Sequence, residues 1–330
     1  MARLTTPFAK AKHNVEPTKD DKDNAQKAHL EVRTHLERDP TLQSYGIDTV
    51  LIGSYKRNVS IRRVKDVDVL SKLPYLLGNC DPRTLLQQFG RVLATAYGPQ
   101  RVELQDRSLK VDFPTLDLTV DVVPARPSLA RPNSGYIEIP DKNGGWQETN
   151  PEKLTELTSQ MNKHYGGEYV PLVKLIRQTR RNNLDKRPGG FFFEILTYHA
   201  AMSGLGADSD ESLFVSALES IARQLHDVVV LGAPVPDPTR PGECIAIRTT
   251  AAQMTAAERT FRELAAKARQ ATKNTACEAA LAYQQILGRN DDGETVFEMP
   301  AACNSDGTEK QLIDPKRGAL NVPSGTKRFA

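Results

Sequence analysis

Hydrophobic positions along the chain repeat either every two residues, as in strands, or every three to four, as in helices. Both patterns occur before residue 125, and only the helical one occurs after residue 150. Before this change, strands are expected where apolar and polar residues alternate, at 49–52, 64–73, 107–113 and 115–123. Helices are expected at 20–37 and 82–96, where apolar residues return every three or four positions. The first 16 residues show neither pattern and are expected to be irregular.

After residue 150 the pattern is helical. Asn150 suits the N-cap of a helix and Pro151 suits its first turn. Helices are expected at 151–164, 170–183, 191–203, 210–226, 254–272 and 274–287. The loop-rich stretch 126–149 lies between the two parts, and the polar residues after 289 are expected to form a mobile tail or a loosely attached wrap.

These patterns predict an α+β protein with two lobes. The expected divisions are an N-terminal segment and helix (1–45), a catalytic core (46–149), a helical domain (150–290) and a flexible or loosely attached C-terminal tail (291–330). A chain of 330 residues is long enough for two such lobes.

Composition narrows the class of protein without identifying a function. The net charge of +3 is too small to indicate a nucleic-acid partner, and 39% hydrophobic residues is ordinary for a globular protein. No membrane span and no signal peptide are expected, which predicts a cytoplasmic protein. Four widely spaced cysteines predict reduced thiols, with no disulfide framework and no zinc ribbon: Cys80, Cys244, Cys277 and Cys303.

The most informative stretch of the chain begins at Gly53-Ser54 and ends with two aspartates two residues apart, Asp66 and Asp68. Side chains two apart on a strand point to the same face, so both carboxylates face the same way. Two neighbouring like charges are costly unless a cation holds them, and Mg²⁺ prefers carboxylate and phosphate oxygens. A Gly-Ser turn offers a phosphate backbone N–H groups and a hydroxyl. These are the parts of a nucleotidyl-transfer site.

A third carboxylate is needed if two metal ions are to hold the attacking and leaving oxygens. Asp121 is the candidate, because it lies in the middle of an apolar strand. Asp117 lies on the same face four residues earlier and is the alternative, and Asp112 lies on the preceding strand.

The chain resembles the nucleotidyltransferase superfamily of DNA polymerase β type in Gly53-Ser54, in Asp66-x-Asp68 and in Val120-Asp121-Val-Val-Pro-Ala125. Within it, the chain is most similar to the bacterial CD-NTases, which are related to cyclic GMP–AMP synthase and oligoadenylate synthetase. Further segments carry the likeness over roughly residues 20–250: Ile61-Arg62, Trp146-x-x-Thr149-Asn150-Pro151, Asn162-Lys163, Val173-Lys174-Leu175-Ile176 and Phe191-Phe-Phe-Glu194-Ile-Leu.

The resemblance implies a polymerase-β-like mixed sheet in the catalytic lobe, a mainly helical second lobe and a nucleotide cleft between them. It implies ATP or other NTPs as substrates and Mg²⁺ as the cofactor, with Mn²⁺ as its alternative. It also implies Asp66, Asp68 and Asp121 as catalytic metal ligands, with Gly53, Ser54 and Lys174 binding the nucleotide. The product would be a cyclic or linear oligonucleotide messenger that acts on an effector in antiphage defence.

The chain departs from the family at two places. Asn58-Val59 replaces the usual Gly-Thr, and Asn tolerates the left-handed backbone that such a turn needs. Gly190 replaces a serine that often touches the triphosphate, which removes one phosphate contact. The zinc ribbon of the animal cyclic GMP–AMP synthase is absent from the sequence, so sensing of double-stranded DNA is not carried over.

Other interpretations stay open at this point. Lys174 could be a surface lysine on an amphipathic helix. The basic run from Arg177 to Arg187 could be a solvated helix end or a phosphate-binding surface. Phe191 to Phe193 are expected in a helix core rather than as a platform for base stacking.

Alternative functions are an RNA-tailing or macromolecule-nucleotidylating transferase and a catalytically silent regulatory protein. An activating protein or RNA and conjugation of the C-terminal Ala330 by an associated transferase are further candidate partnerships, and no membrane partner is expected.

Overall fold

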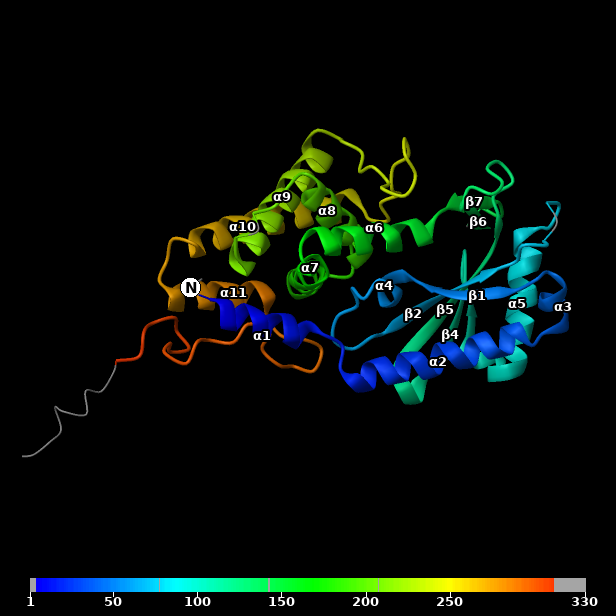
Figure 1. Ribbon diagram of the computed structural model, residues 1–330, viewed down its shortest axis with the longest axis horizontal. Helices are drawn as coiled ribbons and strands as arrows, with labels where there is room; N and C mark the ends of the chain where they lie inside the picture. The colour runs from blue at the N-terminus through cyan, green and yellow to red at the C-terminus, as the bar shows by residue number, and fades with distance from the viewer. Residues whose placement is uncertain (1–3, 77, 142, 207, 312–330) are drawn as a thin grey trace, which may run out of the picture.

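The computed structural model describes residues 4–311 except Leu77, Lys142 and Ala207, and it shows two lobes along an elongated molecule (Figure 1). Its helices are α1 (Thr5–Val15), α2 (Lys19–Glu37), α3 (Pro40–Ser44), α4 (Gly53–Lys56), α5 (Pro82–Tyr97), α6 (Pro151–His164), α7 (Tyr169–Asn183), α8 (Gly190–Met202), α9 (Asp210–Val230), α10 (Ala251–Ala271) and α11 (Ala276–Leu287). Its strands are β1 (Asp48–Ile52), β2 (Asp66–Lys72), β3 (Val102–Leu104), β4 (Leu109–Phe113), β5 (Leu118–Pro127), β6 (Ile137–Pro140) and β7 (Trp146–Thr149).

One lobe is built on a mixed sheet with the strand order β1–β2–β5–β4–β3. β2 and β5 run parallel, the other pairs are antiparallel, and β6 and β7 extend from the end of β5. Helices α2 and α5 pack on one face, where alternate strand residues such as Val67, Val69, Val120 and Val122 are fully buried. Because strand side chains alternate, the residues between these valines face the other way, toward the second lobe.

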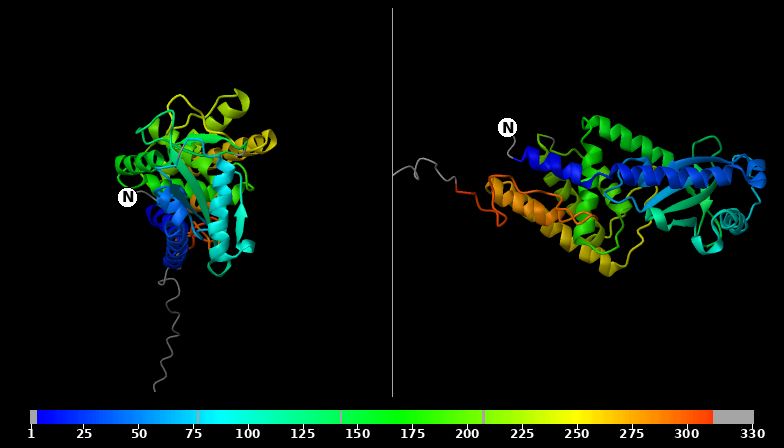
Figure 2. Two further views of the ribbon diagram at one scale, coloured as in Figure 1. Left: turned by 90° about the vertical axis from the view of Figure 1, so that its right-hand side faces the viewer. Right: turned by 90° about the horizontal axis from the view of Figure 1, so that it is seen from below.

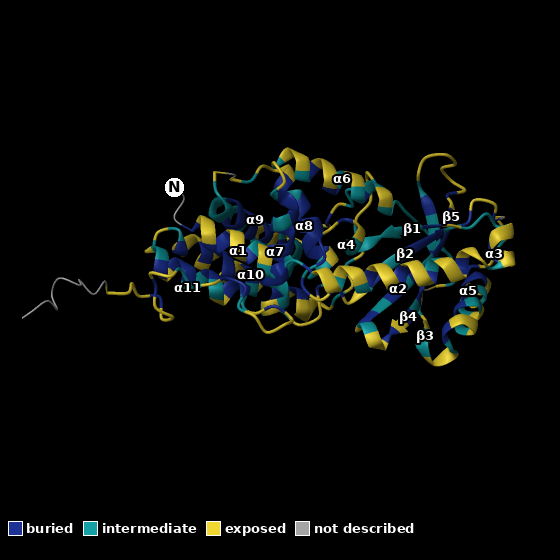
Figure 3. Ribbon diagram, turned by 60° about the horizontal axis from the view of Figure 1, so that its bottom comes forward, coloured by how far each residue is buried: buried dark blue, intermediate teal, exposed yellow. Residues whose placement is uncertain are grey.

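The second lobe consists of α1 and α6 to α11 (Figure 1). Its core contains aromatic residues from several of these helices, including Phe193, Phe214, Phe261 and Tyr283, all of which are fully or almost fully buried. Figure 3 shows buried residues concentrated in this lobe, whereas α2 turns an exposed side outward. The predicted α+β architecture with two lobes is confirmed.

Most predicted elements lie where the pattern placed them, and α6 begins and ends at the expected residues 151 and 164. The stretch 126–149 was expected to be loop-rich, and in the structure it contains the end of β5 together with β6 and β7. Within the described residues, no helix combines the length and apolar character needed to cross a membrane.

The expectation of an irregular N-terminus is wrong. Helix α1 occupies Thr5–Val15 and buries Phe8, Ala11 and Val15 in the helical lobe, where the Phe8 ring lies 5.0 Å from the Phe297 ring. Seen from below, α1 and α2 follow one another along the molecule from the helical lobe to the sheet lobe (Figure 2). The first 45 residues are therefore divided between the two lobes.

The expectation of a loosely attached C-terminal segment is also wrong for residues 291–311. Val296 and Phe297 are fully buried against the helical lobe, and Arg62 forms ion pairs with Asp292 (3.2 Å) and Glu294 (3.0 Å). The packing of Phe297 between α1 and α11 supplies the apolar burial that holds this segment.

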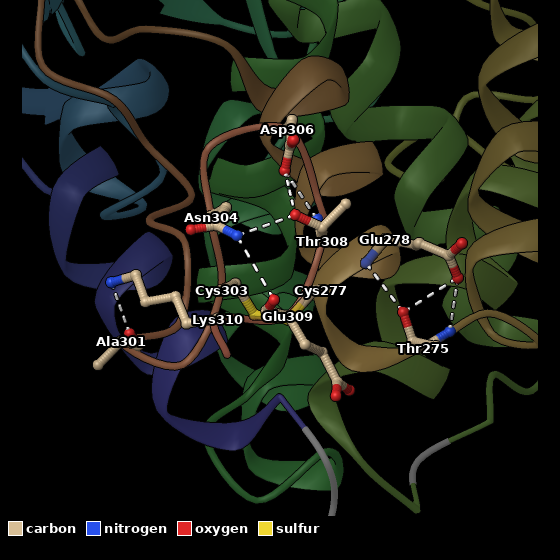
Figure 4. The surroundings of a disulfide bond; sticks show 10 residues. All are labelled: Thr275, Cys277, Glu278, Ala301, Cys303, Asn304, Asp306, Thr308, Glu309 and Lys310. Carbon is tan, nitrogen blue, oxygen red and sulfur yellow. Dashed lines mark hydrogen bonds between the residues drawn. A yellow bond between two sulfur atoms is a disulfide. The ribbon is translucent and has the colours of Figure 1, made fainter. Parts of the chain in front are cut away.

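Two of the four cysteines form a disulfide, which contradicts the expectation of reduced thiols throughout. Cys277 on α11 is bonded to Cys303 in the C-terminal segment, with 5.3 Å between their Cα atoms (Figure 4). The two are 26 residues apart in sequence, and they meet because the chain folds back over α11. Cys80 and Cys244 are free, as expected.

Candidate active site

The sheet register brings together the aspartates that the sequence singled out. Asp68 on β2 is the direct register partner of Asp121 on the parallel strand β5. Asp66 lies two residues before Asp68, so it shares the same face of the sheet. Neighbouring strands are about 4.8 Å apart, so carboxylates at partner positions are adjacent.

Burial and mutual repulsion disfavour the ionised form of this acidic group. Burial raises the pKa of Asp68 to about 7, and the charges of Asp66 and Asp121 add to the effect. Burial, followed by the charge of Asp66, raises the pKa of Asp121 to about 6. The Oδ1 atom of Asp121 is buried and accepts no hydrogen bond. An acidic cluster with an orphaned buried oxygen fits a hard divalent cation.

As the side chains stand, no three His, Cys, Asp or Glu residues in the described part of the chain are gathered closely enough to hold a metal ion. Asp66 and Asp68 line the cavity described below, whereas Asp121 lies one strand away from Asp68 and is not a lining residue. For the three carboxylates to share a cation, the Asp121 side chain would therefore have to turn toward the cavity.

Gly53 lies against the aspartates and cannot be replaced without a clash. Its φ is +74°, and a Cβ there would lie only 1.8 Å from Oδ2 of Asp68. The Gly-Ser pair was expected to form a turn, and it opens the single-turn helix α4. The Ser54 hydroxyl lies 3.1 Å from the hydroxyl of Ser60. Asn58, which follows α4, has a φ of +58°, so it adopts the left-handed backbone anticipated for it.

The structure does not place Lys174 among the residues that line the cavities beside the aspartates, so it gives no support to the expectation that Lys174 binds the triphosphate. Lys174 is fully buried on α7, and its Nζ lies 2.6 Å from both carboxylate oxygens of Glu16 and 3.4 Å from Oδ1 of Asn58. Burial lowers the pKa of Lys174, and the Glu16 carboxylate opposes this shift. This buried ion pair connects Glu16, at the end of α1, to α7, and it gives Lys174 a structural role in the packing of the two helices.

Arg177, one turn further along α7, is the basic residue of this helix that lines the cavity together with Asp66 and Asp68. Its side chain is 18% exposed and lines the cavity beside Asp66 and Asp68, whose charges oppose the lowering of the Arg177 pKa by burial. Its Nε atom is buried and has no hydrogen-bond partner. The charge pattern alone indicates only a basic run from Arg177 to Arg187. The helical period of α7 is the signal that separates Arg177 from Lys174, since residues three apart point about 60° away from each other around a helix.

Two residues of α8 shape the surroundings of the Arg177 guanidinium. Glu194 on α8 accepts hydrogen bonds from Nε (2.6 Å) and Nη2 (3.1 Å) of Arg57, and it lies 3.6 Å from Nη1 of Arg177. A Cβ at Gly190 would lie 3.1 Å from Cζ of Arg177, so the glycine leaves space for the guanidinium. Any side chain at position 190, including the serine that is usual in the family, would crowd the guanidinium of Arg177.

A cavity of about 520 Å³ lies between the lobes beside these groups. It is lined by Gly53, Ser54, Asp66, Asp68 and Arg177, together with Thr149, Asn150, Pro151, Leu154, Phe191, Ile195, Asp237 and Thr239. A smaller cavity of about 150 Å³ shares Ser54, Asp66, Arg177 and Gly190 with it and adds the basic residues Arg63, Lys65, Arg180 and Arg181. The larger cavity has the volume of a nucleotide-sized ligand site, and the smaller one suits phosphates.

The structure also locates Asp117 and the three phenylalanines at 191–193, for which the sequence led to specific expectations. Asp117, the alternative third carboxylate, is exposed at the start of β5, where it pairs with Lys65 and lies 3.6 Å from Arg63. Phe192 and Phe193 are buried as expected, but Phe191 is 52% exposed and lines the cavity. An exposed aromatic ring at this place offers a surface on which a base can stack.

A mixed sheet carrying acids on adjacent parallel strands, next to a cavity with cationic walls, defines a site of the nucleotidyltransferase class. Residues 2–162 match the family model of the Second Messenger Oligonucleotide or Dinucleotide Synthetase domain. The chain is 32% identical over 326 residues to a cyclic AMP-AMP-AMP synthase of Acinetobacter sp. (strain ATCC 27244 / 9458), covering 94% of this chain and 91% of that protein.

Two solved structures of Escherichia coli MS115-1 CdnC share the fold. The complex of CdnC with HORMA-deltaN has a TM-score of 0.67 at 18% identity and covers 88% of this chain and 96% of that chain. CdnC with ATP has a TM-score of 0.67 at 17% identity and covers 89% and 98%. The chain belongs to the bacterial CD-NTase family, whose members are nucleotidyltransferases that make oligonucleotide second messengers from nucleoside triphosphates.

Proposed function

We propose that this protein joins ATP molecules into a cyclic oligoadenylate, with Asp66, Asp68 and Asp121 as its catalytic carboxylates. The observation that carries the proposal is the register of β2 and β5, which makes Asp68 and Asp121 neighbours on the face beside the cavity. The choice of adenine is supported by the similarity to a cyclic AMP-AMP-AMP synthase.

We propose that Asp66, Asp68 and Asp121 hold Mg²⁺, or Mn²⁺ in its place. The orphaned Oδ1 of Asp121 and the raised pKa of Asp68 support this assignment, because a cation would offset the repulsion within the group. Bound there, such an ion supplies charge neutralisation at the phosphates and lowers the pKa of the attacking hydroxyl.

The chain's own residues position the donor nucleotide. The Gly53 N–H, the Ser54 hydroxyl and the Arg177 guanidinium face the region of the β- and γ-phosphates, and the Glu194 carboxylate keeps Arg177 oriented. A ribose hydroxyl oxygen of the acceptor forms a bond to the α-phosphorus. The bond from that phosphorus to the β-phosphate oxygen breaks, pyrophosphate leaves, and the hydroxyl proton passes to solvent. Positioning and charge stabilisation are the protein's contributions.

The test is incubation of the full chain with an equal mixture of the four NTPs and Mg²⁺, followed by mass spectrometry of the products. Cyclic adenine oligonucleotides are the expected result, and the double variant Asp66→Asn/Asp68→Asn is expected to release no pyrophosphate while keeping its fold. Label transferred only to added RNA or protein would point instead to a tailing or macromolecule-modifying transferase. Binding of NTPs without Mg²⁺-dependent turnover under any condition would favour a silent regulatory protein.

We also propose an activating protein partner, on the support of the CdnC complex with HORMA-deltaN, and an effector that responds to the product in antiphage defence. We propose a cytoplasmic location because the substrates are nucleoside triphosphates. The Cys277–Cys303 disulfide does not add to this argument, because the cytoplasm is a reducing compartment in which disulfides are rare. Conjugation at Ala330 lies outside the described residues and stays a prediction.

A further inference from the structure

A short turn of the C-terminal segment, at residues 290–294, lies beside the smaller basic cavity. It carries three carboxylates, and we call it the acidic turn. Asn290 is buried and holds the turn closed, since its Oδ1 accepts hydrogen bonds from the backbone N–H groups of Asp292 (3.1 Å) and Glu294 (3.0 Å). Its Nδ2 donates to the carbonyl oxygen of Asn14 (3.0 Å), which fixes the turn to α1. The acidic turn therefore has a defined place in the protein.

Two acids of this turn pair with arginines that line the cavity of about 150 Å³. Nε of Arg63 donates a hydrogen bond to Oδ1 of Asp292 (2.6 Å). Nη1 of Arg181, on α7, donates a hydrogen bond to Oδ2 of Asp291 (2.6 Å). The turn thus reaches the cavity through two guanidinium groups, one from each side.

The backbone of Arg63 is itself held in an uncommon conformation. Its φ is +60°, in the left-handed region that residues other than glycine rarely adopt. Its backbone N–H donates to Oδ2 of Asp21 (3.2 Å), so carboxylates from two distant parts of the chain hold its main chain and its side chain. Such strain persists only where surrounding contacts enforce it, and it is concentrated at functional positions. A guanidinium has five N–H donors, so the bond to Asp292 leaves others for a phosphate.

The two acids have opposite effects on a phosphate in the cavity. Their charges repel it, but the side chains of Asp291 and Asp292 are 34% and 27% exposed, and salt screens exposed charges over about 8 Å. Their hydrogen bonds fix the arginines in advance, so less side-chain freedom is lost when a phosphate binds. Because orientation acts at direct contact, it is expected to outweigh the screened repulsion.

We propose that Asp291 and Asp292 are positioning residues that hold Arg181 and Arg63 for the terminal phosphates of the donor NTP. This inference rests on the proposed function and adds the C-terminal segment to the active site. The acidic turn lies beyond residues 2–162, which match the family model, so that match assigns it no role.

The kinetic test separates KM from kcat. Asp291→Asn/Asp292→Asn is expected to raise the KM for ATP about 10-fold and to change kcat by less than about twofold, as for the loss of one charge-assisted contact made on binding. The matched control is Glu294→Gln, which removes a carboxylate of the same turn. Glu294 pairs with Arg62 (3.0 Å), which lines neither cavity beside the aspartates, so KM should stay unchanged. A KM that falls in Asp291→Asn/Asp292→Asn, or that rises equally in Glu294→Gln, would overturn the inference.

A double-mutant cycle tests whether the acids act through the arginines. Arg63→Ala/Arg181→Ala is expected to raise the KM for ATP by itself. Adding the two Asn substitutions should then change KM by less than about twofold, because the groups that the acids position are gone. A further 10-fold rise on that background, of the size in, would give the acids a separate role and overturn the inference.

A binding test does not depend on turnover. Calorimetric titration of the full chain with inorganic tripolyphosphate should give a Kd about 10-fold higher in Asp291→Asn/Asp292→Asn than in the wild type or in Glu294→Gln. The same result in a chain that makes no oligonucleotide would overturn the proposed function and keep the inference. Oligonucleotide synthesis with an unchanged Kd in the variant would overturn the inference and keep the proposed function.

Discussion

The two faces of the sheet at β2 and β5 are made by alternate residues of the same two strands, yet their environments are opposite. On one face Val67, Val69, Val120 and Val122 are fully buried under α2 and α5. On the other face Asp66, Asp68 and Asp121 repel one another, and Asp121 keeps a buried oxygen without a partner. The apolar face is complete in the protein alone, whereas the acidic face gains stability only from something that binds to it.

The largest effect is expected from the acidic face. Asp121→Asn should lower turnover by at least about 1000-fold, because it removes a charge that positions the cation at the reacting phosphate. Asp117→Asn is the matched control, since this exposed residue pairs with Lys65 away from the site. Pyrophosphate release under saturating ATP measures both variants, and equal losses would contradict the assignment.

Arg177 and Lys174, one turn apart on α7, extend the comparison from the two faces of the sheet to a cation at the cavity and a cation in a buried ion pair. Arg177→Ala should raise the KM for ATP about 10- to 100-fold, because it removes a charge-assisted phosphate contact. Lys174→Met should leave KM unchanged and lower the free energy of unfolding by about 1–3 kcal/mol, because Glu16 loses its partner. Steady-state kinetics and denaturant titration of both variants separate the roles, and a raised KM only in Lys174→Met would reverse them.

The acidic face also predicts a pH dependence of stability in the metal-free protein. The pKa of Asp68 rises from 3.8 to about 7 on folding, so between these values the folded state binds more protons than the unfolded state. The free energy of unfolding should therefore fall as the pH rises through this range. Asp68→Asn should be more stable than the wild type at pH 8, by an amount on the order of a few kcal/mol, and equally stable near pH 4. Denaturant titrations in EDTA test this, and addition of Mg²⁺ should reduce the difference.

The smallest effect on activity is expected from the apolar face. Val69→Ala removes buried methyl groups and should lower the free energy of unfolding by roughly 1–3 kcal/mol. Its kcat/KM, measured well below the melting temperature, should stay close to that of the wild type. A loss of activity larger than the loss of folded protein would show that the two faces are not independent.

The sequence predicted the parts of the fold in which local pattern and packing agree. β2 and α6 were located to within two residues, because alternation and the Asn150 cap are local signals. Helix α1 was missed although Leu4, Phe8, Ala11 and Val15 have helical spacing, since the polar residues between them concealed the buried stripe. The disulfide could not be predicted, because the spacing of cysteines does not tell which part of the chain folds back.

The candidate site was predicted as far as its carboxylates and the Gly-Ser pair. A strand pattern places Asp66 and Asp68 on one face, but only the register of β2 against β5 brings Asp121, and not Asp117, beside them. The choice between Lys174 and Arg177 depends on Glu16, which is 158 residues from Lys174 in sequence. Long-range partners of this kind leave no local signal.

The most direct measurement is a crystal structure with Mn²⁺ and a non-hydrolysable ATP analogue, with the metal located by its anomalous scattering. The account predicts manganese coordinated by carboxylate oxygens of Asp66, Asp68 and Asp121, with Arg177 on the phosphates. Manganese bound elsewhere, or an Asp121 side chain that does not contact the metal while the nucleotide occupies the cavity, would contradict it.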